Sequence, residues 1–151
     1  MSEWEKRIAS SFSAQGLMAT LGAELVHVSP GEVHIAWRRR AELSQQHGYM
    51  HAGAVTSVVD TACGYAALTV APPGHEVLTV EFKVNFMRPA LADRFLAIGK
   101  VIKAGKTLTV CQGEVTAEQG AGQTVVALMQ ATIMNVATHE PRTGQPLEPL
   151  R

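Results

Sequence analysis

Aromatic residues and net charge are both scarce in this sequence. Phe, Trp and Tyr together make up 5% of 151 residues, and 13 Lys and Arg balance 13 Asp and Glu. Proteins that bind nucleic acids usually carry a basic excess or a basic stripe. The one basic run, Arg38-Arg39-Arg40, closes an expected strand, and we interpret it as a solvated strand end. We therefore expect no nucleic-acid partner, and any cationic site must be local.

Cysteine is also scarce. Cys63 and Cys111 lie inside apolar segments, without the spacing of a metal site or of a disulfide framework, and we interpret them as buried free thiols. Histidines are more numerous than cysteines. Five of them show no grouping with nearby acids of the kind that metal ligands have: His27, His34, His47, His75 and His139. We expect no bound metal.

Neither a secretory signal nor a membrane span is favoured. The first residues carry acids and lack the apolar core of a signal peptide. The longest apolar stretch, residues 52–71, contains Asp60 and lacks basic flanks, which makes a membrane span a poor interpretation. We expect a cytoplasmic protein with no membrane partner.

The order of elements can be predicted from periodicity and from turn residues. The first helix is expected over residues 4–14, where Trp4, Ile8 and Phe12 share one face, and a short helical turn over residues 17–21. Strands are expected over residues 23–28 and 32–37, joined by a Ser-Pro-Gly turn. The alanine-rich apolar segment of residues 52–70 favours a long helix, which a Pro-Pro-Gly sequence ends.

The remaining segments have the pattern of strands, over residues 78–87, 94–103, 107–117 and 124–137. In the first of them Leu78, Val80 and Phe82 alternate with polar residues, so that Thr79 falls on the polar side. An antiparallel sheet needs its apolar face covered, and only one long helix is available to cover it. The predicted fold class is α+β, with an antiparallel sheet wrapped around one long central helix.

The chain length favours one domain, over residues 1–137 and including the N-terminal helix. Residues 138–151 are rich in Pro, Gly and polar residues, and we expect a disordered tail there.

Asp60 is the only charged residue of the central helix. A helix that is apolar nearly all round is expected to be buried, and a buried carboxylate is costly unless it is partnered or functional. Gly53, Ser57, Asp60 and Gly64 form a stripe of small residues, which leaves room for a ligand or for the backbone of another helix. A catalytic acid and a member of a structural network both remain open at this point.

The start of the same helix offers a second functional group. Its first amides have no acceptor within the helix, and with the helix dipole they suit a carbonyl oxygen that gains negative charge. Asp60 lies eight residues beyond Ala52, which is about 12 Å along the axis. Two antiparallel helices related by a twofold axis would bring the acid of one subunit to the amides of the other. The sequence therefore predicts a homodimer with a shared site.

Three motifs resemble the phenylacetyl-CoA thioesterase-like branch of the hotdog superfamily. HAGAVTSVVDTA (residues 51–62) is similar to the family's His-Gly-Gly, apolar run and Asp-x-Ala, with Ala52 in place of the first Gly. VEFKVNFMRPA (residues 80–90) is similar to a strand that ends in Arg-Pro-Ala, and Gly105-Lys106 falls at a hairpin before the terminal strands. The resemblance covers residues 16–136 and implies a hotdog fold.

The resemblance also implies roles at the central helix. Asp60 corresponds to the nucleophile or general base. The amide of Ala52 corresponds to the donor that polarises the thioester carbonyl, beside Gly53 of the motif. His51 corresponds to the motif histidine, which organises the helix start by hydrogen bonding.

Other roles fall outside that helix. Gln45 matches an Asn or Gln near the attacking water or the carbonyl, and Thr79 matches a Ser that holds this water. Arg88, Lys103 and Lys106, at a strand end and a hairpin, are our candidates for binding the phosphates of coenzyme A.

The expected activity is hydrolysis of an acyl-CoA, in which coenzyme A is part of the substrate and no cofactor is needed. Relatives often pair two dimers into a tetramer, so a dimer of dimers is expected. No Ser-His-Asp arrangement or nucleophile elbow is present to support a serine hydrolase. A hotdog hydratase or dehydratase, and a non-catalytic acyl-CoA-binding module, are the alternatives.

Overall fold

A computed structural model describes residues 1–138, and the rest of the expected tail, residues 139–151, lies outside the described residues. The helices and strands follow one another in the predicted order, with boundaries moved by a few residues. In chain order they are α1 (Glu3–Ser13), α2 (Gly16–Leu21), β1 (Glu24–Ser29), β2 (Glu32–Arg38), the 3-10 turn η1 (Ala41–Leu43), α3 (Ala52–Val70), β3 (His75–Phe86), β4 (Arg94–Ala104), β5 (Leu108–Gln119) and β6 (Gly122–Ala137).

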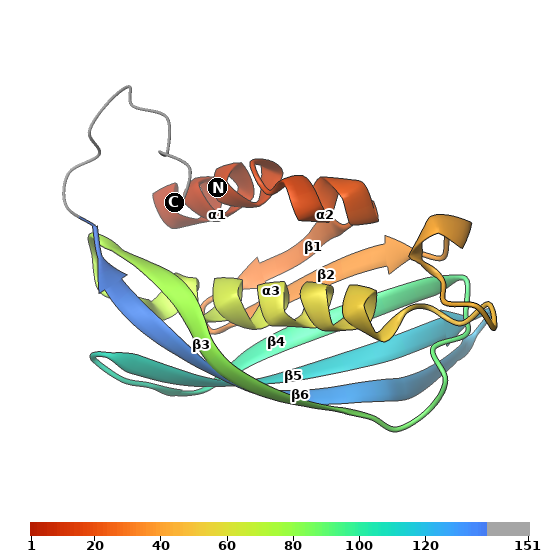
Figure 1. The fold of residues 1–151 in the computed structure, drawn as a ribbon. Helices are drawn as coiled ribbons and strands as arrows, with labels where there is room; N and C mark the ends of the chain where they lie inside the picture. The colour runs from red at the N-terminus through yellow and green to blue at the C-terminus, as the bar shows by residue number, and fades with distance from the viewer. Residues whose placement is uncertain (139–151) are drawn as a thin grey trace, which may run out of the picture.

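The strands form one antiparallel sheet of six, in the order β1-β2-β4-β5-β6-β3. The sheet curves around α3, and α1 and α2 lie on the opposite side of this helix from β4, β5 and β6 (Figure 1). A single long helix enclosed by an antiparallel sheet is the hotdog arrangement, and the predicted α+β fold class is confirmed.

The central helix is buried because its side chains are apolar on most of its circumference. Nine of its residues are buried, and the sheet supplies most of the surfaces they meet: Val55, Val58, Val59, Ala62, Cys63, Tyr65, Ala66, Ala67 and Leu68. By length and composition α3 could also cross a membrane, the one helix of residues 1–138 for which this holds. A core helix has the same composition, and the packing of α3 accounts for it.

Two glycines set how closely α3 approaches the sheet. Gly99 of β4 and Gly113 of β5 are paired across the two strands. A Cβ at Gly99 would lie 2.4 Å from the carbonyl carbon and oxygen of Ala62, and one at Gly113 would lie 2.5 Å from Val59 Cγ2. The α3 backbone therefore rests on Gly99, and the Val59 side chain occupies the space that a side chain at Gly113 would need.

Strand β3 corrects one expectation. Simple alternation predicts that Leu78 and Val80 share the apolar face with Phe82, but Leu78 is 58% and Val80 52% exposed. A β-bulge between Thr79 and Glu81 is the reason, because it adds a residue and exchanges the two faces of the strand. Thr79 thus pairs with the fully buried Ile133 and lies on the helix side.

The glycine contact generates a stability prediction. Gly99→Ala should lower the free energy of unfolding by about 1–3 kcal/mol, because the added methyl group meets backbone atoms that cannot rotate away. Chemical denaturation at fixed protein concentration measures this change. Gly16→Ala is the matched control, since no atom lies within 4 Å of a Cβ there. Equal stability of Gly99→Ala and the wild type would show that α3 does not need this close contact.

Candidate active site

Asp60 projects from the middle of α3 toward β3 and is only partly buried. The Thr79 hydroxyl donates a hydrogen bond of 2.8 Å to Asp60 Oδ1. Thr79 falls on the polar side of the sequence alternation, and the bulge in β3 is what brings it to the acid. The second carboxylate oxygen receives no hydrogen bond from residues 1–138, which leaves it available to a ligand.

Burial raises the pKa of Asp60 above its usual range, and the hydrogen bond from Thr79 opposes this rise. The neighbouring hydroxyls on α3 do not offset the burial. Ser57 donates to the carbonyl oxygen of Gly53 at 2.7 Å, and Thr61 donates to that of Ser57 at 2.8 Å. Thr79 is thus the one residue that stabilises the charged form of the acid by a direct contact within the described chain.

A cavity of about 240 Å³ opens beside Asp60, between α1, α3 and β3. Its wall includes the Tyr65 hydroxyl, which lies 3.0 Å from Ser11 Oγ and accepts a hydrogen bond of 2.9 Å from Gln15 Nε2. These three residues are not among those that the sequence predicts for the site. The amphipathic pattern of the first helix predicts that it packs on something, but the pattern does not identify α3 as the surface it meets.

The start of α3 is held by His51. Its Nδ1 accepts a hydrogen bond of 2.8 Å from the Gly53 amide, so His51 organises the helix start by the kind of contact that the resemblance implies. A Cβ at Gly53 would lie 3.0 Å from this nitrogen, which explains glycine at that position. The Ala52 amide is exposed, and no acceptor within residues 1–138 bonds to it. Ala52 therefore offers a free donor, whereas the Gly53 amide is already occupied.

A second cavity, of about 390 Å³, lies at this end of the helix. Gln45 and Ala52 both line it, together with Arg88 from the loop after β3. The Gln45 side-chain oxygen accepts a hydrogen bond from the His47 amide, and Arg88 Nη1 donates to the Val125 carbonyl at 2.9 Å. Three of the residues predicted from sequence thus meet around one cavity.

The predicted site residues form two separate groups in one chain. Asp60 and Thr79 line the first cavity, while Ala52, Gln45 and Arg88 line the second, and the two linings share no residue. Asp60 lies eight residues beyond Ala52, which separates the two by about 12 Å along α3. A single chain therefore does not bring its acid to its own free amide.

Lys103 and Lys106 lie apart from Arg88. They belong to the end of β4 and the following turn, whereas Arg88 lies near the start of α3, at the other end of the sheet. Asn135 anchors this turn by donating hydrogen bonds of 3.0 Å to the carbonyls of Gly105 and Lys106. One chain does not gather the three cations.

Both cysteines are free and buried, as predicted. Burial raises the pKa of the Cys111 thiol to about 12, and it raises the pKa of Cys63 further. A thiol needs to ionise to act as a nucleophile. Neither cysteine is therefore suited to nucleophilic catalysis at neutral pH.

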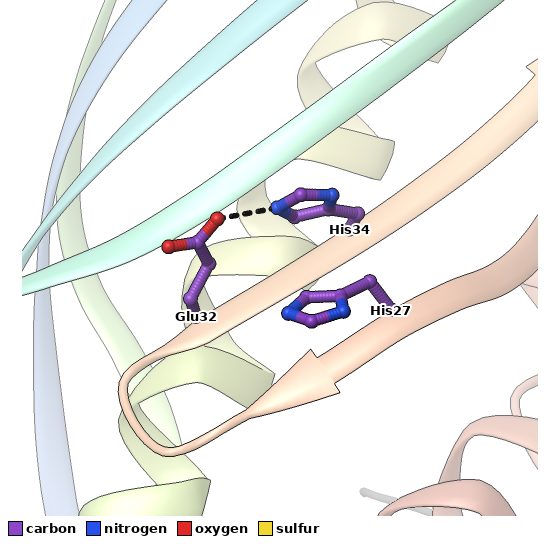
Figure 2. A group of neighbouring side chains, drawn as sticks. All are labelled: His27, Glu32 and His34. Atoms are coloured by element: carbon purple, nitrogen blue, oxygen red, sulfur yellow. Dashed lines mark hydrogen bonds and ion pairs between the residues drawn. The ribbon is translucent and has the colours of Figure 1, made fainter.

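One expectation about histidines is wrong. The sequence shows no grouping of histidine with acids, but the structure brings His27, Glu32 and His34 together on the hairpin of β1 and β2 (Figure 2). The cluster lies away from both cavities, whose linings contain none of its residues. His139 lies outside the described residues.

Comparisons with known proteins bear on the family and the fold of the chain. The family model of the thioesterase superfamily matches residues 47–123. A thioesterase family protein from Silicibacter pomeroyi superposes with a TM-score of 0.87 at 41% identity, covering 89% of this chain and 99% of that protein. The PaaI protein of the phenylacetic acid degradation operon of Escherichia coli shares the fold, with a TM-score of 0.80 at 21% identity over 89% of this chain and 94% of that one. By sequence, a 1,4-dihydroxy-2-naphthoyl-CoA hydrolase of Listeria monocytogenes is 26% identical over 103 residues, which are 68% of this chain and 84% of the relative.

The hydrogen bond between Thr79 and Asp60 generates a prediction about ionisation. Thr79→Val should raise the pKa of Asp60 further, because it removes the contact that favours the charged form and leaves the burial. A ¹³C NMR titration of the carboxyl carbons measures this, with Asp60→Asn to assign the signal. Thr79→Ser retains the hydroxyl and should leave the titration close to that of the wild type. An unchanged titration in Thr79→Val would show that the contact does not influence the acid.

Proposed function

Because the chain belongs to the thioesterase superfamily and is a thioester hydrolase, we propose that it hydrolyses acyl-CoA at a site shared by two subunits. The products are a carboxylic acid and free coenzyme A. The observation that carries this proposal is the separation of a partly buried acid, Asp60, from a free amide at the start of the same helix, Ala52. Each group has a cavity beside it, and within one chain neither group lines the cavity of the other.

In the proposed reaction the thioester carbonyl oxygen accepts a hydrogen bond from the Ala52 amide. The helix dipole adds to the stabilisation of the negative charge that develops on this oxygen. The Gly53 amide stays with His51, so its role is to hold the helix start rather than to contact substrate. Gln45 lines the same cavity as Ala52 and orients the carbonyl or the attacking water.

Asp60 of the other subunit supplies the reacting carboxylate. In one route it attacks the carbonyl carbon, the carbon–sulfur bond breaks, coenzyme A leaves as the thiolate, and water hydrolyses the mixed anhydride. In the other route Asp60 takes a proton from a water molecule, whose oxygen attacks the carbonyl carbon. The carbon–sulfur bond then breaks, and coenzyme A leaves as the thiolate, which takes up a proton. Both routes need the ionised acid, and Thr79 supports the charged form in both.

The edge of the sheet supports the proposed homodimer. β3 is an edge strand, with one side unpaired in the single chain. Beyond the bulge Phe82 and Phe86 pair with the buried Ala131 and Ala127, yet they are 43% and 44% exposed. Exposed aromatic side chains on a bare edge strand favour a partner there. A second copy, related by a twofold axis, would cover them and set the two α3 helices antiparallel.

A further contact between dimers fits the outer face of the sheet. Leu78 of β3 pairs with Met134 of β6, which pairs with Leu108 of β5, so the three form one row. Leu78 is 58% and Leu108 47% exposed. This apolar row supports the pairing of two dimers into a tetramer.

Coenzyme A would lie along the subunit boundary. Arg88 stands beside the cavity of Ala52, and a twofold axis would bring the far end of the partner's sheet, with its Lys103 and Lys106, to the same side. These three cations would then bind the phosphates of the nucleotide. No cofactor is needed beyond the coenzyme A of the substrate.

The alternative hydratase or dehydratase activity is less well supported. That chemistry on the same fold pairs an acid with a histidine, and the described lining of the cavity beside Asp60 contains no histidine. The hydrolytic route needs only the acid, the amide and water, and it is the one that these residues favour.

The first functional test replaces the acid. Asp60→Asn should lower the rate of thiol release from an acyl-CoA panel by about 10²–10⁴-fold, the usual loss when a catalytic acid or base is removed. Its melting temperature at neutral pH should not fall. Burial raises the pKa of Asp60, so the stability that the group confers at low pH is lost as pH rises through this pKa.

The matched control is Asp93→Asn, because Asp93 is exposed and lines neither cavity. Its rate should equal that of the wild type. A rate for Asp60→Asn within a few-fold of the wild type, with every acyl group tested, would rule out Asp60 as the reacting carboxylate and with it the proposed mechanism.

The second test mixes two inactive variants. Asp60→Asn lacks the acid, and Ala52→Pro lacks the amide donor at a helix position that tolerates proline. Neither variant should work alone. Mixed dimers, purified with two different tags, should recover one intact site of the two. Folding and size of each variant are checked first by circular dichroism and gel filtration. Folded mixed dimers without activity would show that each subunit completes its own site.

A further inference from the structure

The hairpin of β1 and β2 carries two histidines and a glutamate on one face. His27 and His34 are paired across the strands, with ring centroids 4.6 Å apart. Glu32 lies two residues before His34 on the same face, and its Oε1 is 2.6 Å from His34 Nε2. The alternate residues Val33 and Ile35 are fully buried, so the three polar side chains point away from the core. Figure 2 shows the two rings and the carboxylate gathered beside the hairpin.

We propose that His27, Glu32 and His34 form a binding site for a divalent transition-metal ion of the zinc class. Each residue offers one ligand atom, and the three atoms lie within 4.8 Å of one another. Imidazole nitrogen and carboxylate oxygen suit Zn²⁺ at about 2.0–2.2 Å, and two histidines with one glutamate form an established type of zinc site. Three protein ligands leave a fourth position for water or for a further ligand.

The surroundings allow the ion to bind with small movements. A zinc ion would replace the hydrogen bond between His34 and Glu32, and the exposed His27 ring can turn to present a nitrogen. Lys100 of β4 is the cation that faces the cluster, with Nζ 3.4 Å from Glu32 Oε2. It contacts the carboxylate oxygen that points away from His34 and leaves Oε1 for the metal.

One of the two imidazole rings has a hydrogen-bond partner outside the cluster. Ser29 Oγ lies 3.0 Å from His27 Nε2 and provides a hydrogen-bond partner that can orient this ring.

The strands that carry the cluster are held on both sides. Gly31 in the turn donates a hydrogen bond of 2.7 Å to Thr69 Oγ1 near the end of α3, and it accepts one of 2.8 Å from the Val101 amide of β4. Bound metal would therefore stabilise a hairpin that is tied to both the helix and the sheet. Because binding to the folded state alone adds to stability, the whole chain should melt at a higher temperature with zinc.

The test uses the full chain without a histidine tag. Titration with ZnCl₂ by calorimetry should give one ion per chain, and the melting temperature should rise with zinc concentration. His34→Gln, His27→Gln and Glu32→Gln should each weaken binding by at least about tenfold, since each removes a direct ligand. His75→Gln, at a histidine outside the cluster, should bind zinc as the wild type does. Binding should also weaken as pH is lowered, because histidine ligands must be neutral.

Rates of thiol release separate this proposal from the proposed function, because the cluster lies outside both cavities of the site. The three cluster variants should keep the wild-type rate without metal. Absence of zinc binding by the wild type would overturn the proposal. Equal affinity in the wild type and all three cluster variants would do the same, since the zinc would then be held elsewhere.

Discussion

The close contact of α3 with the paired glycines Gly99 and Gly113 is the constraint on which the rest of this structure depends. Because neither glycine has a side chain, the α3 backbone lies directly over Gly99, and the side chains of Val59 and Cys63 fill the space over Gly113. A helix at that distance needs small residues of its own, which explains the alanines at its centre. It also places Asp60 within reach of the edge strand, where the Thr79 hydroxyl meets it.

Placing the carboxylate of Asp60 in a partly buried environment costs free energy, and this cost indicates why the acid is there. The acid stands on a helix that is otherwise apolar, and burial raises its pKa while one hydroxyl opposes the effect. An acid kept only for structure would be expected to have an ion pair or several donors. Asp60 has a single donor among the described residues and a cavity in front of it. A single donor and an adjacent cavity favour a catalytic role for Asp60 over a structural one.

Much of the fold could be predicted from the sequence, because the apolar run around Asp60 and the turns between strands are strong local signals. The same signals located Asp60 and the start of its helix. The place of Tyr65 in the cavity wall could not be predicted, because its hydrogen-bond partners, Ser11 and Gln15, lie far away in the chain. The pairing of His27 with His34 could be predicted from the sequence, because a two-residue turn at Pro30 and Gly31 pairs residue 27 with residue 34.

Because of the bulge in β3, the number of residues in this strand decides which side chains face the helix. Before the bulge Thr79 faces the helix, and after the bulge Phe82 and Val84 face that same side. In a strand of regular phase with Thr79 inside, the charged Glu81 and Lys83 would instead face the helix. Val80 is the extra residue between two halves of the strand whose inward-facing positions alternate in opposite phase. The first half places Thr79 at the acid, and the second half places Phe82 and Val84 on the apolar side of the edge strand. Loss of this one residue would change the orientation of half the strand, so we expect this stretch to tolerate substitution far better than deletion.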